Sequence, residues 1–353
     1  MKKKIGLLTG GGDCPGLNAV IRAAVRTAVQ CYDFEVVGIE SGFEGLMQLR
    51  TIPLDNESVR GLLPKGGTLL KTSNRGDPFS YPSEDGPVDR SALVIENIES
   101  LGIDALIVIG GDGSLTIASR LSMMGIPIVG VPKTIDNDID ATDYTFGFLT
   151  AVATATEAVD RLHSTAESHS RVMILEVMGR DAGWIALYSG LAGGADIILI
   201  PEIPFDLDVV VKSIEDRKNS GAEFDIIVIA EGATPLGGSP TYIDPKKKRL
   251  GGIAYQLADD LRTRIEMEVR VTVLGHVQRG GSPISLDRVL ATRFGEAAVH
   301  LVAKGEFGKM VALQHRSIVA VPLEEAVKHR KLVQKDHDLV STARCLGVSF
   351  GDE

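Results

Sequence analysis

Cysteine and basic charge are both scarce in this chain, and each shortage excludes a class of protein. The three cysteines, Cys14, Cys31 and Cys345, are odd in number, widely spaced and without any C-x-x-C pair. Neither a disulfide framework nor a zinc site is therefore expected. The 37 basic residues are outnumbered by 47 acidic ones, which gives a formal net charge of −10. This balance argues against non-specific binding of nucleic acid.

Long apolar runs are also missing. No stretch is long enough to span a membrane, and the basic start Lys2 to Lys4 leads into only Ile5 to Leu8 before a glycine cluster. That stretch is too short for a signal peptide, so we expect a cytoplasmic protein with no membrane partner. The 353 residues exceed what one hydrophobic core usually serves, which predicts two lobes with a cleft between them.

Short apolar runs alternate with segments of helical pattern in two successive series. The runs are Ile5 to Thr9, Glu35 to Ile39, Ala105 to Ile109 and Ile126 to Val131, then Val172 to Leu175, Ile197 to Ile200, Phe224 to Ala230 and Val269 to Leu274. Helical patterns cover about 149–163, 207–218 and 252–266, residues 71–90 indicate a loop, and 246–248 a solvated turn. The alternation predicts an α/β fold of two Rossmann-like lobes, each with a mostly parallel sheet covered by helices.

Two glycine-rich segments follow strands and open into helices. The first is Gly10-Gly11-Gly12 and the second runs from Gly110 to Ser114. Glycines let a backbone approach phosphate closely, and a helix N-terminus supplies free N–H groups, although the first segment is neither a G-x-G-x-x-G nor a Walker A motif. Asp112, between two glycines, suits Mg²⁺ beside a polyphosphate. Two such loops on adjacent strands predict a nucleotide site.

Asp136 and Asp138 follow the next strand. In an extended segment side chains alternate, so these carboxylates would point the same way and Asn137 the opposite way. One carboxylate could then take a proton while the other tunes it or helps to hold a metal. A lone Asp-Asn-Asp would indicate only a turn, but the upstream glycine motif favours a catalytic pair.

Further along the chain, cationic residues occur at strand ends. They are Arg171, Arg180, Arg270, His276 and Arg279. Taken singly, each arginine could be a surface ion-pair partner and His276 a core histidine. Because guanidinium groups match phosphate oxygens, the set together favours a sugar-phosphate site.

With these residues identified, the chain resembles the 6-phosphofructokinases from Gly10 to about Leu301. The motifs that carry the resemblance are Thr9 to Asn18, Gly110 to Ser114, Pro132 to Asp138, Met178 to Arg180, Ala230 to Gly232 and Leu274 to Pro283. The resemblance implies a glycolytic transferase, a kinase that moves the terminal phosphoryl group of MgATP to the 1-hydroxyl of fructose 6-phosphate and gives fructose 1,6-bisphosphate.

The resemblance also implies roles for single residues. Asp136 matches the base that deprotonates the sugar hydroxyl, with Asp138, Lys133 and Arg180 beside it in the catalytic set, and Asp112 matches the Mg²⁺ ligand. The matches to the nucleotide-phosphate site are Gly12, Arg75, Gly111, Asp112, Gly113 and Ser114. Those to the fructose 6-phosphate site are Thr134, Ile135, Asp136, Arg171, Met178, Gly179, Arg180, Glu231, Arg270, His276, Val277, Gln278 and Arg279.

The same resemblance implies how the chain divides into lobes and that it assembles with copies of itself. Residues 1–147 with about 277–318 are expected to form the larger, nucleotide-binding lobe, and 148–276 with about 319–353 the smaller, sugar-phosphate-binding lobe, with the active site in the cleft. In the family some cations come from a neighbouring subunit, which implies a homo-oligomer, a dimer or tetramer, with shared sites.

Two departures from the family pattern bear on donor and regulation. Lys133 stands where ATP enzymes carry glycine and is typical of pyrophosphate-using and mixed-substrate members, whereas Gly113 is retained where pyrophosphate enzymes carry a bulkier Asp. Arg22 and Arg26 match effector-site arginines, but the expected partners are absent from 55–65 and before the strand at Phe224. The sequence therefore gives no basis for assuming activation by ADP or inhibition by phosphoenolpyruvate.

Two alternatives remain. One is a reversible phosphofructokinase that takes pyrophosphate as donor. The other is a sensor of nucleotides or sugar phosphates with a dead active site, against which the intact Asp112, Asp136 and Asp138 argue. A dehydrogenase is disfavoured because no acidic residue follows an early G-x-G-x-x-G.

Overall fold

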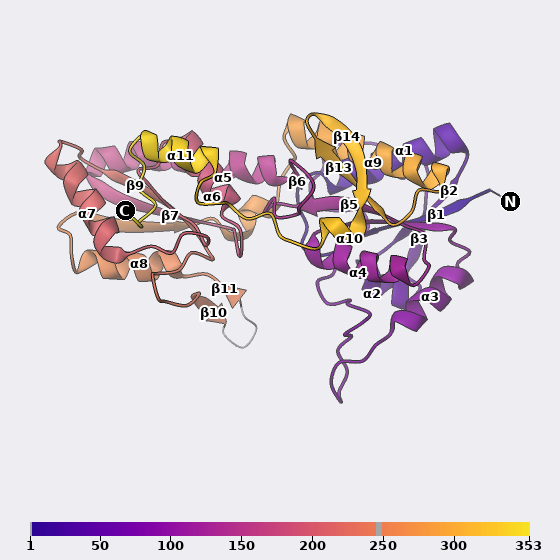
Figure 1. Ribbon diagram of the computed structural model, residues 1–353. Coiled ribbons are helices and arrows are strands. Elements are labelled where there is room, and N and C mark those ends of the chain that lie inside the picture. The colour runs from indigo at the N-terminus through magenta and orange to yellow at the C-terminus, as the bar shows by residue number, and fades with distance from the viewer. Residues whose placement is uncertain (1, 245–248) are drawn as a thin grey trace. The chain divides into compact units, whose positions relative to one another are not determined.

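The computed structural model describes residues 2–244 and 249–353 and divides them into two compact units (Figure 1). Unit 1 comprises the chain up to Ile135, Ile139–Leu149 and Arg279–Arg330. Unit 2 comprises Asp136–Asp138, Thr150–Gln278 and Lys331–Glu353. The turn predicted at 246–248 lies outside the described residues. Within the described ranges, no helix has the length and apolar character needed to cross a membrane.

Unit 1 is built on a mostly parallel sheet. Its strands are β1 (Lys4–Thr9), β2 (Glu35–Ile39), β3 (Thr51–Leu54), β4 (Ala105–Gly110), β5 (Ile128–Thr134), β6 (Phe146–Gly147), β13 (Lys309–Gln314) and β14 (Ser317–Pro322). The order is β14-β13-β5-β4-β1-β2-β3, with β6 beside β5. The four predicted strands are confirmed as β1, β2, β4 and β5, whereas the antiparallel edge strands β3 and β14 were not predicted.

Helices cover both faces of this sheet (Figure 1). One face carries α1 (Leu17–Tyr32) and α9 (Ser285–Lys304), which pack on each other, and the other carries α2 (Gly42–Met47), α3 (Ser91–Ser100) and α4 (Asp112–Met123). The short helix α10 (Leu323–Ala326) packs beside α4.

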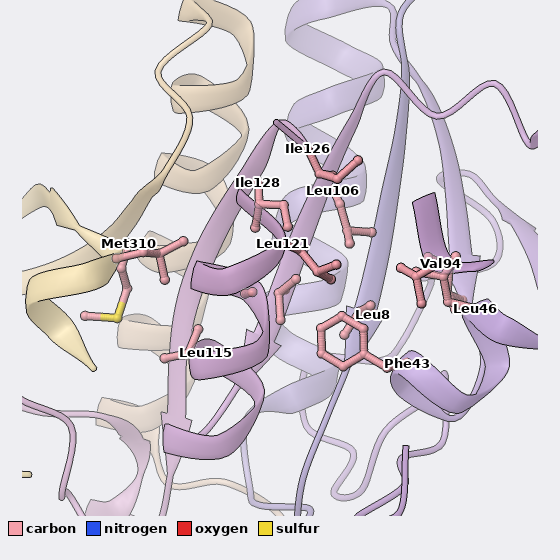
Figure 2. Close-up of a cluster of buried hydrophobic side chains, with 14 of the residues drawn as sticks. Leu8, Phe43, Leu46, Val94, Leu106, Leu115, Leu121, Ile126, Ile128 and Met310 are labelled. Carbon is pink, nitrogen blue, oxygen red and sulfur yellow. The ribbon is translucent and has the colours of Figure 1, made fainter. Parts of the chain in front are cut away.

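Helix α4 is anchored by its apolar face. Figure 2 shows Leu115 and Leu121 of this helix among the side chains of Leu8, Leu106 and Ile128 from the sheet. Both leucines are fully buried, and burial of one such side chain stabilises a fold by about 1.5–3 kcal/mol. This packing fixes the first turn of α4, which begins at Asp112, at the carboxyl end of β4.

Unit 2 has an all-parallel four-stranded sheet. Its order is β12 (Glu268–Val273), β7 (Arg171–Val177), β9 (Asp225–Ala230) and β8 (Ile197–Leu199), which confirms the second predicted series. Its other elements are α5 (Phe148–His169), α6 (Trp184–Gly193), α7 (Leu207–Asn219), β10 (Tyr242–Asp244), β11 (Arg249–Leu250), α8 (Ile253–Arg262), the 3₁₀ turn η1 (Gly275–Arg279) and α11 (Asp338–Cys345). Helices α7 and α8 share one core with the strands.

Two assignments in the predicted division into lobes need correction, and the first is Asp136–Asp138, which was placed in the larger lobe but belongs to unit 2. Residues 319–330 were assigned to the smaller lobe, but they pack in unit 1. The physical reason is the hairpin: β14 pairs antiparallel with β13, and α10 continues directly from it. The chain therefore passes to unit 2 after Arg330.

Candidate active site

The two glycine loops of unit 1 lie side by side because their strands pair. Strand β1 runs parallel to β4, and the Gly10 N–H donates to the Ile109 carbonyl at 2.9 Å. A β-carbon at Gly10 would lie 2.5 Å from Ser114 Oγ, and one at Gly110 would lie 2.3 Å from Ser114 Cβ. Ser114 is buried against both loops. Only glycine fits at these two positions, so the predicted pair of adjacent backbone loops is present.

Two cations hold the tip of the first loop. The Lys133 ammonium donates to the Gly12 carbonyl, and Arg279 Nη1 donates to the Asp13 carbonyl at 3.1 Å. A β-carbon at Gly12 would lie 2.6 Å from Arg279 Nη1. Lys133 is 3% exposed. Positive charge is thus concentrated under the first glycine loop, an arrangement suited to an anion.

Cys14 follows this loop and is completely buried. Its burial raises the pKa of the thiol to about 12, against which the nearby Lys133 acts only in part. The group stays neutral at physiological pH and is not a nucleophile.

Gly113 lies in the first turn of α4 and differs from the other loop glycines. It is exposed, and a β-carbon placed on it would meet nothing within 4 Å. Glycine inside a helix costs about 1 kcal/mol relative to alanine. Since none of the described residues packs against this position, the space beside the loop leaves room for a ligand close to the backbone.

Asp112 begins α4, where a carboxylate is favoured by the helix dipole. Its Oδ2 lies 3.2 Å from Arg330 Nη2. Among the described residues, no group of three or more His, Cys, Asp or Glu side chains could hold a metal. Mg²⁺ ordinarily takes one or two carboxylates and completes its shell with phosphate oxygens and water, so Asp112 fits a Mg²⁺ ion that arrives with a polyphosphate.

The segment Asp136–Asp138 lies in unit 2 and is not extended, contrary to the sequence prediction. Asn137 has φ 51°, in the left-handed region that asparagine tolerates better than most residues. Asn137 is 3% exposed, whereas Asp136 and Asp138 are half-buried, each with its Oδ1 withdrawn from solvent. The exposures of the three residues still alternate, although the segment is not extended.

Most of the residues predicted to bind the sugar phosphate occupy two opposite ends of the unit 2 sheet, whereas Thr134, Ile135 and Arg279 belong to unit 1. Met178 to Arg180 follow the carboxyl end of β7, and Glu231 follows that of β9. Hydrogen bonds join them, because the Glu231 N–H donates to Val177 and the Gly232 N–H donates to Gly179. The turn η1, with His276 and Val277 exposed, follows the carboxyl end of β12.

Arg171 and Arg270 lie near the amino ends of their strands instead. Arg171 is the first residue of β7, and Glu268, its register partner on β12, forms ion pairs with both arginines. Seven residues separate Arg171 from Met178, which at about 3.3 Å per residue is about 23 Å of strand. One small sugar phosphate cannot contact both ends of the same sheet.

Three predicted residues have side chains already engaged or buried. Ile135 is fully buried, so only its backbone is available to a ligand. Gln278 is also fully buried, and its amide accepts from the Met178 N–H at 3.3 Å and donates to the Gly275 carbonyl at 3.0 Å. Thr134, the last residue of β5, is 9% exposed. Gln278 thus connects the segment that follows β7 to the turn η1.

Arg75 lies in the loop predicted at 71–90 and is exposed. The loop is tied down by two cation–π contacts, from Arg120 to the ring of Phe79 at 3.5 Å and from Arg90 to that of Tyr81 at 4.4 Å. Such contacts contribute about 0.5–1 kcal/mol each at exposed sites, so they limit the positions that the loop can take.

Sequence reasoning missed Arg330, Lys331 and Glu268. Arg330 pairs with Asp112, Lys331 contacts the Asp136–Asp138 segment, and Glu268 pairs with two predicted phosphate ligands. None of the three belongs to a recognisable motif, and the partners are 97–218 residues away in sequence, apart from the nearby Arg270.

Comparison with known proteins agrees with this set of features. Residues 4–302 match the phosphofructokinase family model. The chain is 53% identical over 354 residues to the ATP-dependent 6-phosphofructokinase of Chloroflexus aurantiacus, covering 100% of this chain and 99% of that one. It is also 53% identical over 336 residues to the pyrophosphate–fructose 6-phosphate 1-phosphotransferase of Streptomyces coelicolor, covering 94% and 96%.

Among solved structures, the phosphofructokinase of Saccharomyces cerevisiae superposes with a TM-score of 0.81 at 35% identity. The match covers 93% of this chain but 45% of the yeast chain, so the present chain spans less than half of that longer protein.

Proposed function

The chain belongs to the phosphofructokinase family, and we propose that it transfers the terminal phosphoryl group of MgATP to the 1-hydroxyl of fructose 6-phosphate. The observation that carries the donor assignment is the open space at Gly113, at the mouth of the second glycine loop. The paired loops of unit 1 offer backbone N–H groups to the phosphates.

Each requirement of phosphoryl transfer has a candidate in the chain. Lys133 and Arg279, which lie under the first loop, supply positive charge against the donor phosphates. Asp136 is the candidate base for the sugar hydroxyl. Asp112 would hold Mg²⁺, which neutralises charge on the donor phosphates when it is bound.

The sugar phosphate is proposed to bind Met178 to Arg180, Glu231 and His276 of one chain. Its 6-phosphate would be held by Arg171 and Arg270 of another, because about 23 Å of strand separates Arg171 from Met178 within one chain. This division supports a homo-oligomer with shared sites. Glu268 neutralises one of the two arginines, so the pair offers one net positive charge to a phosphate.

The test is transfer of phosphate from MgATP to fructose 6-phosphate, with the product identified by phosphorus NMR as the 1,6-bisphosphate. Asp136→Asn should lower kcat by about 10²–10⁴, while the circular dichroism spectrum and the KM for ATP stay unchanged. Turnover of Asp136→Asn within a few-fold of the unmodified chain would remove this carboxylate from the mechanism.

A second candidate function is transfer from pyrophosphate, and Lys133 favours it. This lysine places a buried cation at the first loop, where it adds positive charge for the phosphates of either donor. The Streptomyces coelicolor relative is named for pyrophosphate. Lys133 therefore tolerates pyrophosphate without excluding ATP, whereas a bulky residue at Gly113 would exclude the nucleotide.

Gly113→Asp separates the two donors. The added carboxylate would meet no protein atom at its β-carbon, so the fold should persist while ATP is excluded by volume and by charge repulsion. We expect the KM for ATP to rise at least about 100-fold, since two anions in contact repel by several kcal/mol. Met123→Asp adds the same charge at the opposite, exposed end of α4, away from the glycine loop, and serves as the control. Equal effects of both substitutions on ATP would refute the role given to Gly113.

A further inference from the structure

Residues 331–333 form a strap against the Asp136–Asp138 segment within unit 2. The Lys331 N–H donates to the Asp138 carbonyl at 3.0 Å, and the Lys331 ammonium donates to Asn137 Oδ1 at 3.1 Å. One residue therefore holds both the backbone and the central side chain of the carboxylate segment.

Trp184 and Glu202 hold the strap in place. The carbonyl of Lys331 accepts from the indole N–H of Trp184 at 2.8 Å, and its ammonium lies 6.0 Å from the centre of that ring. Two residues on, the Val333 N–H donates at 2.8 Å to Glu202, which also accepts from the Gly183 N–H at the start of α6. Val333 is buried. The strap thus links the carboxylate segment to the framework of unit 2.

The bond from Lys331 to Asn137 acts at the point where the segment is least regular. Asn137 is left-handed and buried, and it lies between the two carboxylates. A left-handed residue other than glycine persists only when its surroundings hold it. Rotation of the backbone at Asn137 would redirect both Asp136 and Asp138, so an ammonium bound to the Asn137 amide limits the orientation of both.

We propose that Lys331 is a positioning residue for phosphoryl transfer, which holds Asn137 left-handed and thereby aims the Asp136 carboxylate. The proposal rests on the proposed function, in which Asp136 is the base. Because Lys331 acts through Asn137 and is not assigned a contact with either substrate, its loss should change kcat and leave both KM values nearly unchanged.

The first test compares three variants at the strap. Lys331→Met keeps an unbranched side chain, one atom shorter, and removes the ammonium donor, so kcat should fall by about 10- to 100-fold, as misplacement of a reacting group does, with both KM values within about threefold. Lys331→Arg retains a charged donor and should recover kcat to within about fivefold. Lys335→Met, at an exposed lysine four residues on, should match the unmodified chain.

A double-mutant cycle then identifies the path of the effect. Asn137→Gly accepts the left-handed backbone but lacks the amide, so it breaks the same hydrogen bond from the other side and leaves the strap intact. If Lys331 acts through Asn137, adding Lys331→Met to Asn137→Gly should lower kcat by less than about threefold further. Independent effects that multiply would overturn the proposal.

Trp184, the only tryptophan of the chain, reports whether the strap stays in place. It is 5% exposed and bonds to the carbonyl of residue 331, so its emission should not shift in Lys331→Met. Unchanged emission with reduced kcat supports positioning, and unchanged emission with full kcat overturns it. If the emission of Lys331→Met shifts to the red, the test is the kcat of Asn137→Gly, because this change leaves Trp184 untouched. A reduced kcat of Asn137→Gly supports the proposal, and a full kcat overturns it. An unmodified chain without transferase activity would instead contradict the proposed function.

Discussion

Two inactive variants of this chain should restore activity when they assemble together. One variant is Asp136→Asn, which lacks the base and keeps the arginines. The other is Arg171→Ala with Arg270→Ala, which keeps the base and lacks the phosphate ligands at the amino end of the sheet. Each arginine lost should cost about 1.5–3 kcal/mol of binding to the 6-phosphate, so the second variant should be nearly silent at low fructose 6-phosphate.

The expected recovery of activity follows from the fraction of sites that have both an intact base and intact arginines. If the carboxylate segment of one chain works with the arginines of another, a random 1:1 mixture has an intact base at half of its sites. Half of those sites receive arginines from the complementary variant, so about a quarter of all sites are complete, whatever the number of subunits. Activity should therefore reach about a quarter of that of the unmodified protein.

The assay mixes the variants under conditions of subunit exchange, or co-expresses them, and measures turnover at low fructose 6-phosphate. The control replaces the first partner with a chain that carries Asp136→Asn, Arg171→Ala and Arg270→Ala together, which can complete no site. Activity of the mixture that stays at the mean of the two separate variants would refute the division of the site between chains.

Two further predictions concern stability. Burial raises the pKa of Asp225 from 3.8 to about 6, in spite of its ion pair with Arg217. The carboxyl group therefore binds a proton more tightly in the folded chain than in the unfolded chain. Its contribution to the free energy of unfolding is present below pH 3.8 and is lost as the pH rises to about 6, by at most about 1.4 kcal/mol per pH unit. Urea unfolding at pH 4.5 and pH 6.5 should show a smaller loss of unfolding free energy with rising pH in Asp225→Asn than in the unmodified chain. Equal losses in the two proteins would contradict this prediction. Arg316, at the two-residue turn between β13 and β14, has φ 71°, so Arg316→Gly should stabilise the chain by about 1 kcal/mol; a lower melting temperature would be the contrary result.

The central strands and the glycine loops could be predicted from sequence because their signals are local. Runs such as Ile5 to Thr9 are buried on both faces of a parallel sheet and are continuously apolar. The edge strand β14 was missed because its residues are mostly half-buried or exposed, and the boundary at Arg330 was missed with it. Nothing in Asp-Asn-Asp shows that Asn137 is left-handed, since that conformation depends on its surroundings.

Site residues that belong to sequence motifs could be predicted. Site residues whose contacts join positions far apart in the sequence could not. Gly113 and Asp136 stand in recognisable stretches. By contrast, Lys331 contacts Asn137 across 194 residues of sequence, and Glu268 contacts Arg171 across 97. Those partnerships arise only when the fold brings the segments together, so a reading of residue types and spacing alone cannot find them.

The measurement that tests the account most directly is turnover of fructose 6-phosphate with saturating MgATP and with saturating magnesium pyrophosphate, in parallel, on the unmodified chain. The open space at Gly113 predicts turnover with MgATP, and Gly113→Asp should raise the KM for ATP at least about 100-fold while the circular dichroism spectrum stays the same. Turnover with pyrophosphate and none with ATP would contradict the account and make Lys133 the residue that determines the donor.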